Sequence, residues 1–148
     1  MKRRILWLLL ILVAMGGVFS CLFAEENTQW PSVWDGVYTT AQAARGEAAY
    51  RTSCASCHGM KLEGKGDTPP LTGRDFTWDW DFTGVDNLFE EILFAMPVDR
   101  ESQISALRKA DILAYILKSN GFPAGNRELS ADPEELRVVL FQTVKASQ

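Results

Sequence analysis

Two cysteines three residues apart, followed directly by a histidine, are the residues of this chain best suited to chemistry. They are Cys54, Cys57 and His58 in the run Cys-Ala-Ser-Cys-His. On a helical turn, positions i, i+3 and i+4 share one face, so both thiols and the imidazole would point the same way. Such a group suits covalent haem attachment, because the thiols can add to the two vinyl groups while the imidazole binds the iron. We therefore expect one haem c bound through Cys54 and Cys57, with His58 as an axial ligand.

The same residues have other interpretations, namely a thioredoxin-like dithiol, a zinc site, a chance match or a structural Cys54–Cys57 disulfide. A redox dithiol expects a βαβ context, whereas the flanking sequence favours helices and loops. A structural zinc site needs four Cys or His ligands. The chain has one histidine, and its third cysteine, Cys21, lies in the N-terminal segment. Haem attachment is therefore favoured, and the disulfide is the main remaining alternative.

An iron bound by His58 has a sixth position, and the residue that fills it separates electron transfer from ligand chemistry. There is no second histidine, and two methionines follow the N-terminal segment. Met60 lies two residues past His58 and cannot reach across the macrocycle. Met96 lies 38 residues past His58, after a loop and a helix that can carry the chain to the other face. We expect His58 and Met96 to be the metal ligands, although a methionine beside a helix end is ordinarily core filler.

The elements that must position these ligands are predicted to be about four helices, because no segment shows convincing strand alternation. Thr39 followed by Gln42 resembles a capping box and predicts a first helix over residues 40–53. Gly and Pro residues predict a loop over 59–73. Capping residues and apolar spacing predict three more helices: one that opens at Thr83 and ends near Met96, one from 102 or 105 to 119, and a short one after Asp132. The predicted fold class is all-α.

The N-terminal segment is predicted to direct export. Basic residues 2–4 precede an apolar run, and Ala24 is the small residue that a signal peptidase prefers. We expect residues 1–24 to be a signal peptide and residues 25–148 to form one periplasmic domain. Two alternatives stay open, because residues 5–24 are uncharged and could remain as a membrane anchor, and Cys21 could be lipidated.

The charge balance of the exported chain is acidic. Removal of residues 1–24 would take away three of the 15 basic residues and none of the 19 acidic ones, leaving a formal charge of −7. This acidity argues against nucleic acid and against adsorption to an anionic membrane, because both need a basic surface.

The exported chain resembles the class I cytochrome c family, an all-helical fold around one covalently attached haem. Gly46 and Tyr50 resemble the family's small and aromatic positions, where the first helix crosses the C-terminal helix, here residues 111–117. Pro69 resembles the loop proline whose carbonyl accepts the Nδ1–H of the axial histidine. The resemblance implies that this bond fixes the tautomer of His58.

Trp78 and Trp80 lie where members of the family often have a tryptophan that hydrogen-bonds a haem propionate. Their spacing of two residues leaves open which of them would make this bond. Residues 32–38 and 120–123 resemble bacterial cytochromes associated with periplasmic quinoprotein dehydrogenases. We expect a monomeric one-electron carrier, not itself an enzyme, between a dehydrogenase or quinol-oxidising complex and a terminal acceptor such as an oxidase. The alternatives are a haem sensor or peroxidase-like enzyme with a labile sixth site, and a tethered subunit of a dehydrogenase.

Overall fold

A computed structural model describes residues 31–97 and 104–145, so the predictions for residues 1–24 lie outside the described residues. Within these ranges the chain forms helices and isolated β-bridges but no strand, which confirms the all-α fold class. None of the described helices is long and apolar enough to cross a membrane. The elements are η2 (Val33–Asp35), α2 (Thr40–Ser53), α3 (Ala55–His58), α4 (Arg74–Asp79), α5 (Val85–Glu90), η3 (Glu91–Ala95), α6 (Ala106–Ser119) and α7 (Pro133–Leu136).

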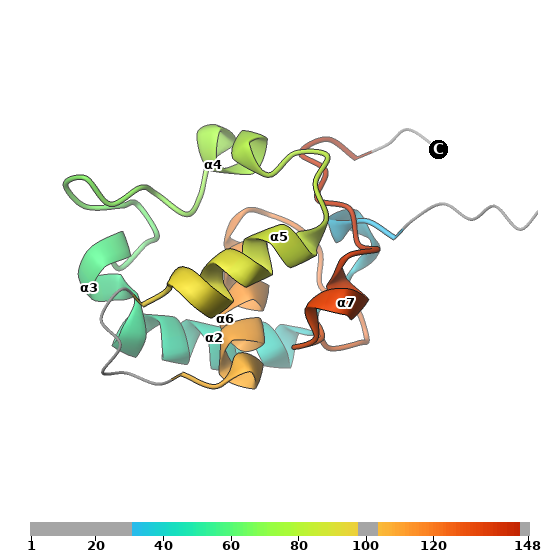
Figure 1. Ribbon diagram of the computed structural model, residues 1–148, viewed down its shortest axis with the longest axis horizontal. Coiled ribbons are helices and arrows are strands. Elements are labelled where there is room, and N and C mark those ends of the chain that lie inside the picture. The colour runs from blue at the N-terminus through green and yellow to red at the C-terminus, as the bar shows by residue number, and fades with distance from the viewer. Residues whose placement is uncertain (1–30, 98–103, 146–148) are drawn as a thin grey trace, which may run out of the picture.

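Helices α2 and α6 cross at the bottom of the view in Figure 1, with α5 lying above them. The crossing is close because Gly46 has no side chain: a methyl group there would lie 1.8 Å from the Asp111 carbonyl oxygen. Next to it, the rings of Tyr50 and Tyr115 lie 5.4 Å apart. The helix crossing implied by the family resemblance is therefore confirmed, and α6 is fixed on the helix that leads directly to Cys54.

Helix α2 begins at the predicted position, but only one of the two hydrogen bonds of the predicted capping box forms. Thr39 Oγ1 accepts a hydrogen bond from the Gln42 backbone N–H at 3.0 Å. The Gln42 side chain makes no reciprocal cap, because it donates to Leu129 O at 2.9 Å and accepts from Leu129 N at 2.7 Å. This buried amide satisfies a peptide group that would otherwise lie unpaired in the core. Gln42 therefore attaches the C-terminal extension, residues 121–145, to α2.

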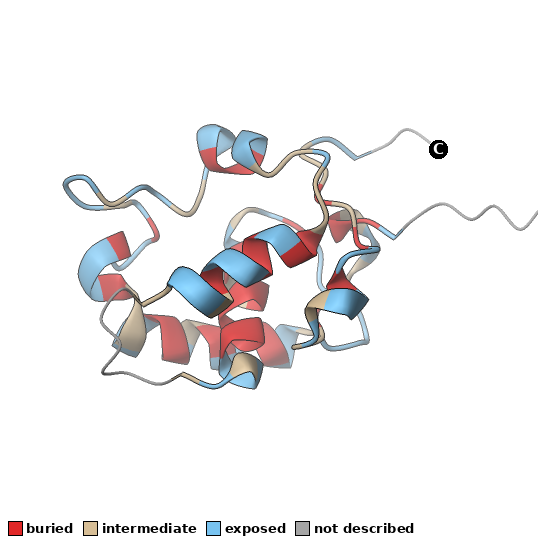
Figure 2. Cartoon of the chain, in the orientation of Figure 1, coloured by how far each residue is buried: buried red, intermediate tan, exposed pale blue. Residues whose placement is uncertain are grey.

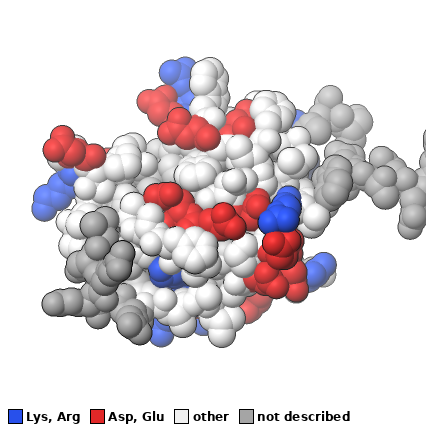
Figure 3. Space-filling view, in the orientation of Figure 1, with Lys and Arg blue, Asp and Glu red and all other residues white. Residues whose placement is uncertain are grey.

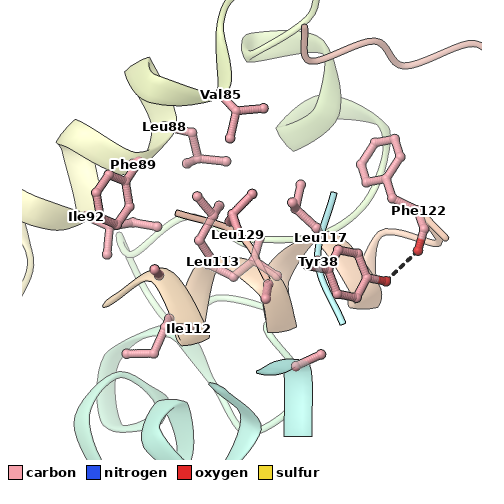
Figure 4. Packing of buried hydrophobic residues seen from close by; sticks show 14 of the residues in the cluster. Tyr38, Val85, Leu88, Phe89, Ile92, Ile112, Leu113, Leu117, Phe122 and Leu129 are labelled. Atoms are coloured by element: carbon pink, nitrogen blue, oxygen red, sulfur yellow. Dashed lines mark hydrogen bonds between the residues drawn. The ribbon is translucent and has the colours of Figure 1, made fainter. Parts of the chain in front are cut away.

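Helix α5 and the π-helical turn η3 occupy the segment predicted to be helical between Thr83 and Met96. Their buried side chains Val85, Leu88, Phe89 and Ile92 point toward apolar residues of α6, among them Leu113 and Leu117 (Figure 4). Figure 2 shows that the opposite side of α5 is exposed. The widening to a π-helix over the last five residues has no signal in the apolar spacing, and Met96 follows it in an extended conformation.

The N-terminal residues 31–39 pack against the C-terminal extension. A methyl group at Gly125 would lie 2.0 Å from the Gly36 carbonyl oxygen, and the Tyr38 hydroxyl donates to Phe122 O at 2.6 Å. The indole N–H of Trp34 donates to Gln142 O at 2.8 Å. The N-terminal residues 31–39 and the C-terminal extension thus form one packed layer beside the helical core. This layer includes the short turn η2, which the sequence did not predict.

Candidate functional site

The three residues of the attachment motif lie on the turn that follows α2. Cys54 ends α2, where its N–H donates to Tyr50 O at 2.8 Å, and it begins α3. The N–H groups of Cys57 and His58 both donate to Cys54 O, at 3.2 and 2.9 Å. Both cysteines are free thiols, so the alternative Cys54–Cys57 disulfide is not formed. The turn holds two thiols and an imidazole on one short helical segment.

The protonation of Cys54 argues against a redox dithiol. Burial raises the pKa of its thiol to about 11, although the Lys109 ammonium acts in the opposite direction. A dithiol that attacks disulfides needs a thiol with a lowered pKa, because the thiolate is the nucleophile. In addition, residues 31–97 and 104–145 contain no cluster of three or more His, Cys, Asp or Glu side chains placed to hold a metal ion.

His58 is oriented by one hydrogen bond and left free at its other nitrogen. The residue is only 7% exposed, and its Nδ1 lies 3.0 Å from Pro69 O. A carbonyl oxygen only accepts, so Nδ1 carries a proton, and in a neutral imidazole this leaves the lone pair on Nε2. Among the described residues, Nε2 has no protein partner, yet no fully buried side-chain nitrogen or oxygen is left unpaired. An imidazole nitrogen and two thiols on one turn form a donor set that fits a haem iron.

The loop that carries Pro69 is folded closely against His58. Gly64 N donates to His58 O at 2.8 Å, and the Tyr50 hydroxyl donates to Gly59 O at 2.7 Å. Gly64 has φ +77°, and a methyl group there would lie 2.6 Å from Thr68 O. Glycine is required because the conformation is left-handed and the space is filled. The loop predicted over 59–73 thus places a proline carbonyl against the imidazole.

The two methionines lie in different surroundings. Met60 is 57% exposed in the loop directly after the attachment turn. Met96 is half-buried at the end of η3, and its carbonyl oxygen accepts a hydrogen bond from Lys109 Nζ at 2.6 Å. The ligand role of Met96 stays a prediction.

Lys109 is a residue that the sequence analysis did not single out. It lies near the start of α6, and it is buried on the same face as Ile112, Leu113 and Ile116. A lysine on the apolar face of a predicted helix is the signal that could have identified it, because lysine is almost never fully buried without partners.

The two tryptophans have distinct environments. Trp78 is 63% exposed, with the Arg74 guanidinium carbon 5.3 Å from its ring centroid. Trp80 is half-buried, packs against the hydrophobic core and lies 6.5 Å from the Phe76 ring. A propionate contact by either tryptophan stays a prediction.

Acidic side chains dominate the face seen in Figure 3, where they gather over α5 and toward α7. Asp86 of α5 is largely buried, and its carboxylate lies 3.6 Å from the Arg137 guanidinium. Near the attachment turn, the backbone N–H groups of Lys61 and Glu63 lower the pKa of the Glu63 carboxyl.

Comparison with known proteins gives two matches. Residues 41–116, just over half of the chain, match the sequence model of the family described as "Cytochrome C oxidase, cbb3-type, subunit III". A 31-residue stretch is 55% identical to cytochrome c-554(547) from Halothiobacillus neapolitanus, covering 21% of this chain and 34% of that relative. The match thus spans about a third of the curated relative. No solved structure matches the chain.

Proposed function

The chain belongs to the family of c-type cytochromes described as cytochrome c oxidase, cbb3-type, subunit III, and we propose that it is a periplasmic one-electron carrier. Membership of this family supports a haem-based electron carrier rather than an enzyme. The finer proposal is a single haem c attached through Cys54 and Cys57, with His58 and Met96 as the two iron ligands. Export of residues 25–148 is part of the proposal, because haem attachment in this family takes place outside the cytoplasm.

The state of His58 is the observation that carries this proposal. Its Nδ1 proton is held by Pro69 O at 3.0 Å, and its Nε2 has no partner in the described part of the chain. The hydrogen bond would fix the ring orientation and increase the basicity of the ligating nitrogen. When bound, the haem supplies reversible one-electron chemistry at iron. The protein's own work is to present one nitrogen in a fixed orientation next to two free thiols.

The remaining residues would set the reduction potential of the haem. A thioether from Met96 raises the reduction potential relative to a second imidazole. Buried apolar side chains on the flanking elements, Leu62, Phe76 and Ile92, would exclude water and favour the less charged ferrous state. Of the two tryptophans, we propose Trp80 as the propionate donor, because its half-buried ring has the fixed position that such a bond needs.

Redox proteins are the proposed partners. A dehydrogenase or quinol-oxidising complex would be the donor, and the resemblance of residues 32–38 and 120–123 favours a quinoprotein dehydrogenase. A terminal oxidase would be the acceptor. The family's description as an oxidase subunit favours a second candidate, a cytochrome held permanently in a larger complex. Copurification of the chain with an oxidase or dehydrogenase through gel filtration would separate this candidate from a free monomeric carrier.

A spectroelectrochemical titration of the haem-loaded protein tests the proposal. We expect one wave that fits a single-electron transfer, a low-spin spectrum and the weak red-region absorption of ferric iron bound to sulfur. The ferrous protein should not bind carbon monoxide readily at neutral pH. Rapid binding of carbon monoxide, or turnover of peroxide, would instead favour the sensor or the peroxidase-like enzyme.

A further inference from the structure

The ammonium group of Lys109 makes two hydrogen bonds to the end of η3. Nζ donates to Leu93 O at 2.7 Å and to Met96 O at 2.6 Å. Leu93 belongs to η3 and Met96 directly follows it, at a helix end where backbone carbonyls lack an intrahelical partner. Lys109 itself is only 7% exposed and belongs to the helix on which η3 packs. One buried side chain therefore joins α6 to the residue expected to bind the iron.

The two bonds compensate a costly burial. Desolvation of an ammonium group is unfavourable unless hydrogen bonds replace the lost water, and burial lowers the pKa of Lys109. Charge-assisted hydrogen bonds are short and strong, and a cation is favoured at a helix C-terminus. The distances of 2.6 and 2.7 Å agree with such bonds. Loss of Lys109 would leave both carbonyls without their donor.

We propose that Lys109 is a positioning residue that clamps the end of η3 to α6 and so holds Met96 at the sixth coordination position of the haem iron. This inference rests on the proposed function. Two bonds to carbonyls three residues apart limit both the position and the rotation of the segment, which a single bond would not. Buried Ile92 and half-buried Leu93 pack the turn through their side chains, whereas Lys109 binds its backbone carbonyls.

Lys109 also connects the two sides of the site. Burial raises the pKa of the Cys54 thiol, and the charge of the Lys109 ammonium partly opposes this rise. Helix α6 is in turn fixed on α2 at Gly46, and α2 ends at Cys54. A continuous series of contacts thus connects the attachment turn to Met96: α2 packs on α6, and Lys109 of α6 donates hydrogen bonds to Leu93 O and Met96 O.

The test uses the haem-loaded protein with Lys109→Met and Lys109→Gln. Two controls are Lys118→Met, at an exposed position of α6, and Leu129→Ala, which lowers stability through the C-terminal extension. The measurements are the red-region sulfur-to-iron absorption and the rate of cyanide binding to the ferric protein, which requires departure of the sulfur. We expect cyanide to bind at least about tenfold faster to both Lys109 variants, equivalent to about 1.4 kcal/mol. Both controls should keep the wild-type rate.

The possible outcomes separate the inference from the proposed function. Lys109 variants that keep the wild-type absorption and bind cyanide within about twofold of the wild-type rate would overturn the clamp, even if they are less stable. If Leu129→Ala accelerates cyanide binding equally, the effect is general loss of stability and the clamp is also overturned. Should Lys109→Met not accumulate, Lys109→Gln decides, because its shorter, uncharged side chain cannot make the two charge-assisted hydrogen bonds of the ammonium group. Wild-type protein without the sulfur-to-iron absorption would contradict the proposed function itself.

Discussion

The segments that carry the two expected iron ligands are held in different ways. The histidine side is held within one continuous stretch of chain: Tyr50, Gly64 and Pro69 all hydrogen-bond to the attachment turn or to His58 itself. The methionine side is held from outside, because Met96 depends on Lys109 of the next helix. The first ligand is therefore fixed by local geometry and the second by the packing of α5 and η3 on α6. This difference predicts unequal responses to substitution.

The largest expected effect comes from Cys54→Ser combined with Cys57→Ser. Without the thiols no thioether can form, so no haem should remain bound after denaturation. The domain should also fold poorly, because a protein of this size would lose the centre of its core. Haem-dependent peroxidase staining of a denaturing gel measures the attachment, and a band as intense as that of the wild type would contradict it.

Met96→Ala should disturb the site less, since the local histidine side is left intact. The haem should stay attached, while the sulfur-to-iron absorption disappears, the reduction potential falls and the ferrous protein binds carbon monoxide. Met60→Ala is the matched control, because Met60 is exposed and adjacent to His58. Absorption spectra with and without carbon monoxide give the result, and an effect of Met60→Ala equal to that of Met96→Ala would refute the assignment.

Gly46→Ala tests the crossing of α2 and α6, which supports both the histidine side and the methionine side of the site. At an exposed helix position this change stabilises by up to about 1 kcal/mol, but here the methyl group would lie 1.8 Å from Asp111 O. We expect a net loss of about 1–3 kcal/mol in the free energy of unfolding, as for an overpacked core. Denaturant unfolding measures the change, with Ala48→Ser, at an exposed position of α2, as the control. A more stable Gly46→Ala protein would show that the helices can separate at no cost.

Gly64→Ala should have the smallest effect, confined to the histidine side. Both Gly64 and Gly66 have positive φ, so alanine is strained at either position. Only at Gly64 does the methyl group meet the backbone next to Pro69, whereas nothing lies within 4 Å at Gly66. Displacement of the Pro69 carbonyl would weaken the hydrogen bond to His58 and raise the reduction potential by less than about 60 mV, a tenfold change in a one-electron equilibrium. Equal potentials in the two variants would mean that the loop absorbs the methyl group.

The predicted helices are those with strong local signals. Helix α2 begins next to the capping residue Thr39, α6 is preceded by Ser105, and α7 begins with the predicted Pro133. Helix α4 was not predicted, since its six residues are too few to show a periodicity and only Phe76 and Thr77 are buried. The π-helical end of α5 was also missed, because apolar spacing does not distinguish it from an α-helix.

The sequence by itself determined the attachment motif, the all-α class and the glycine-rich loop, because each depends on residues close together in the chain. Only the tertiary structure decided what Gln42 and Lys109 do. By type and local position, Gln42 is a helix cap, and Lys109 is a lysine on the apolar face of a helix whose partners the sequence does not name. Burial changed both roles, since a polar group removed from water must find partners wherever the fold brings them. For Gln42 that partner is Leu129, and for Lys109 it is the carbonyl of Met96 together with that of Leu93.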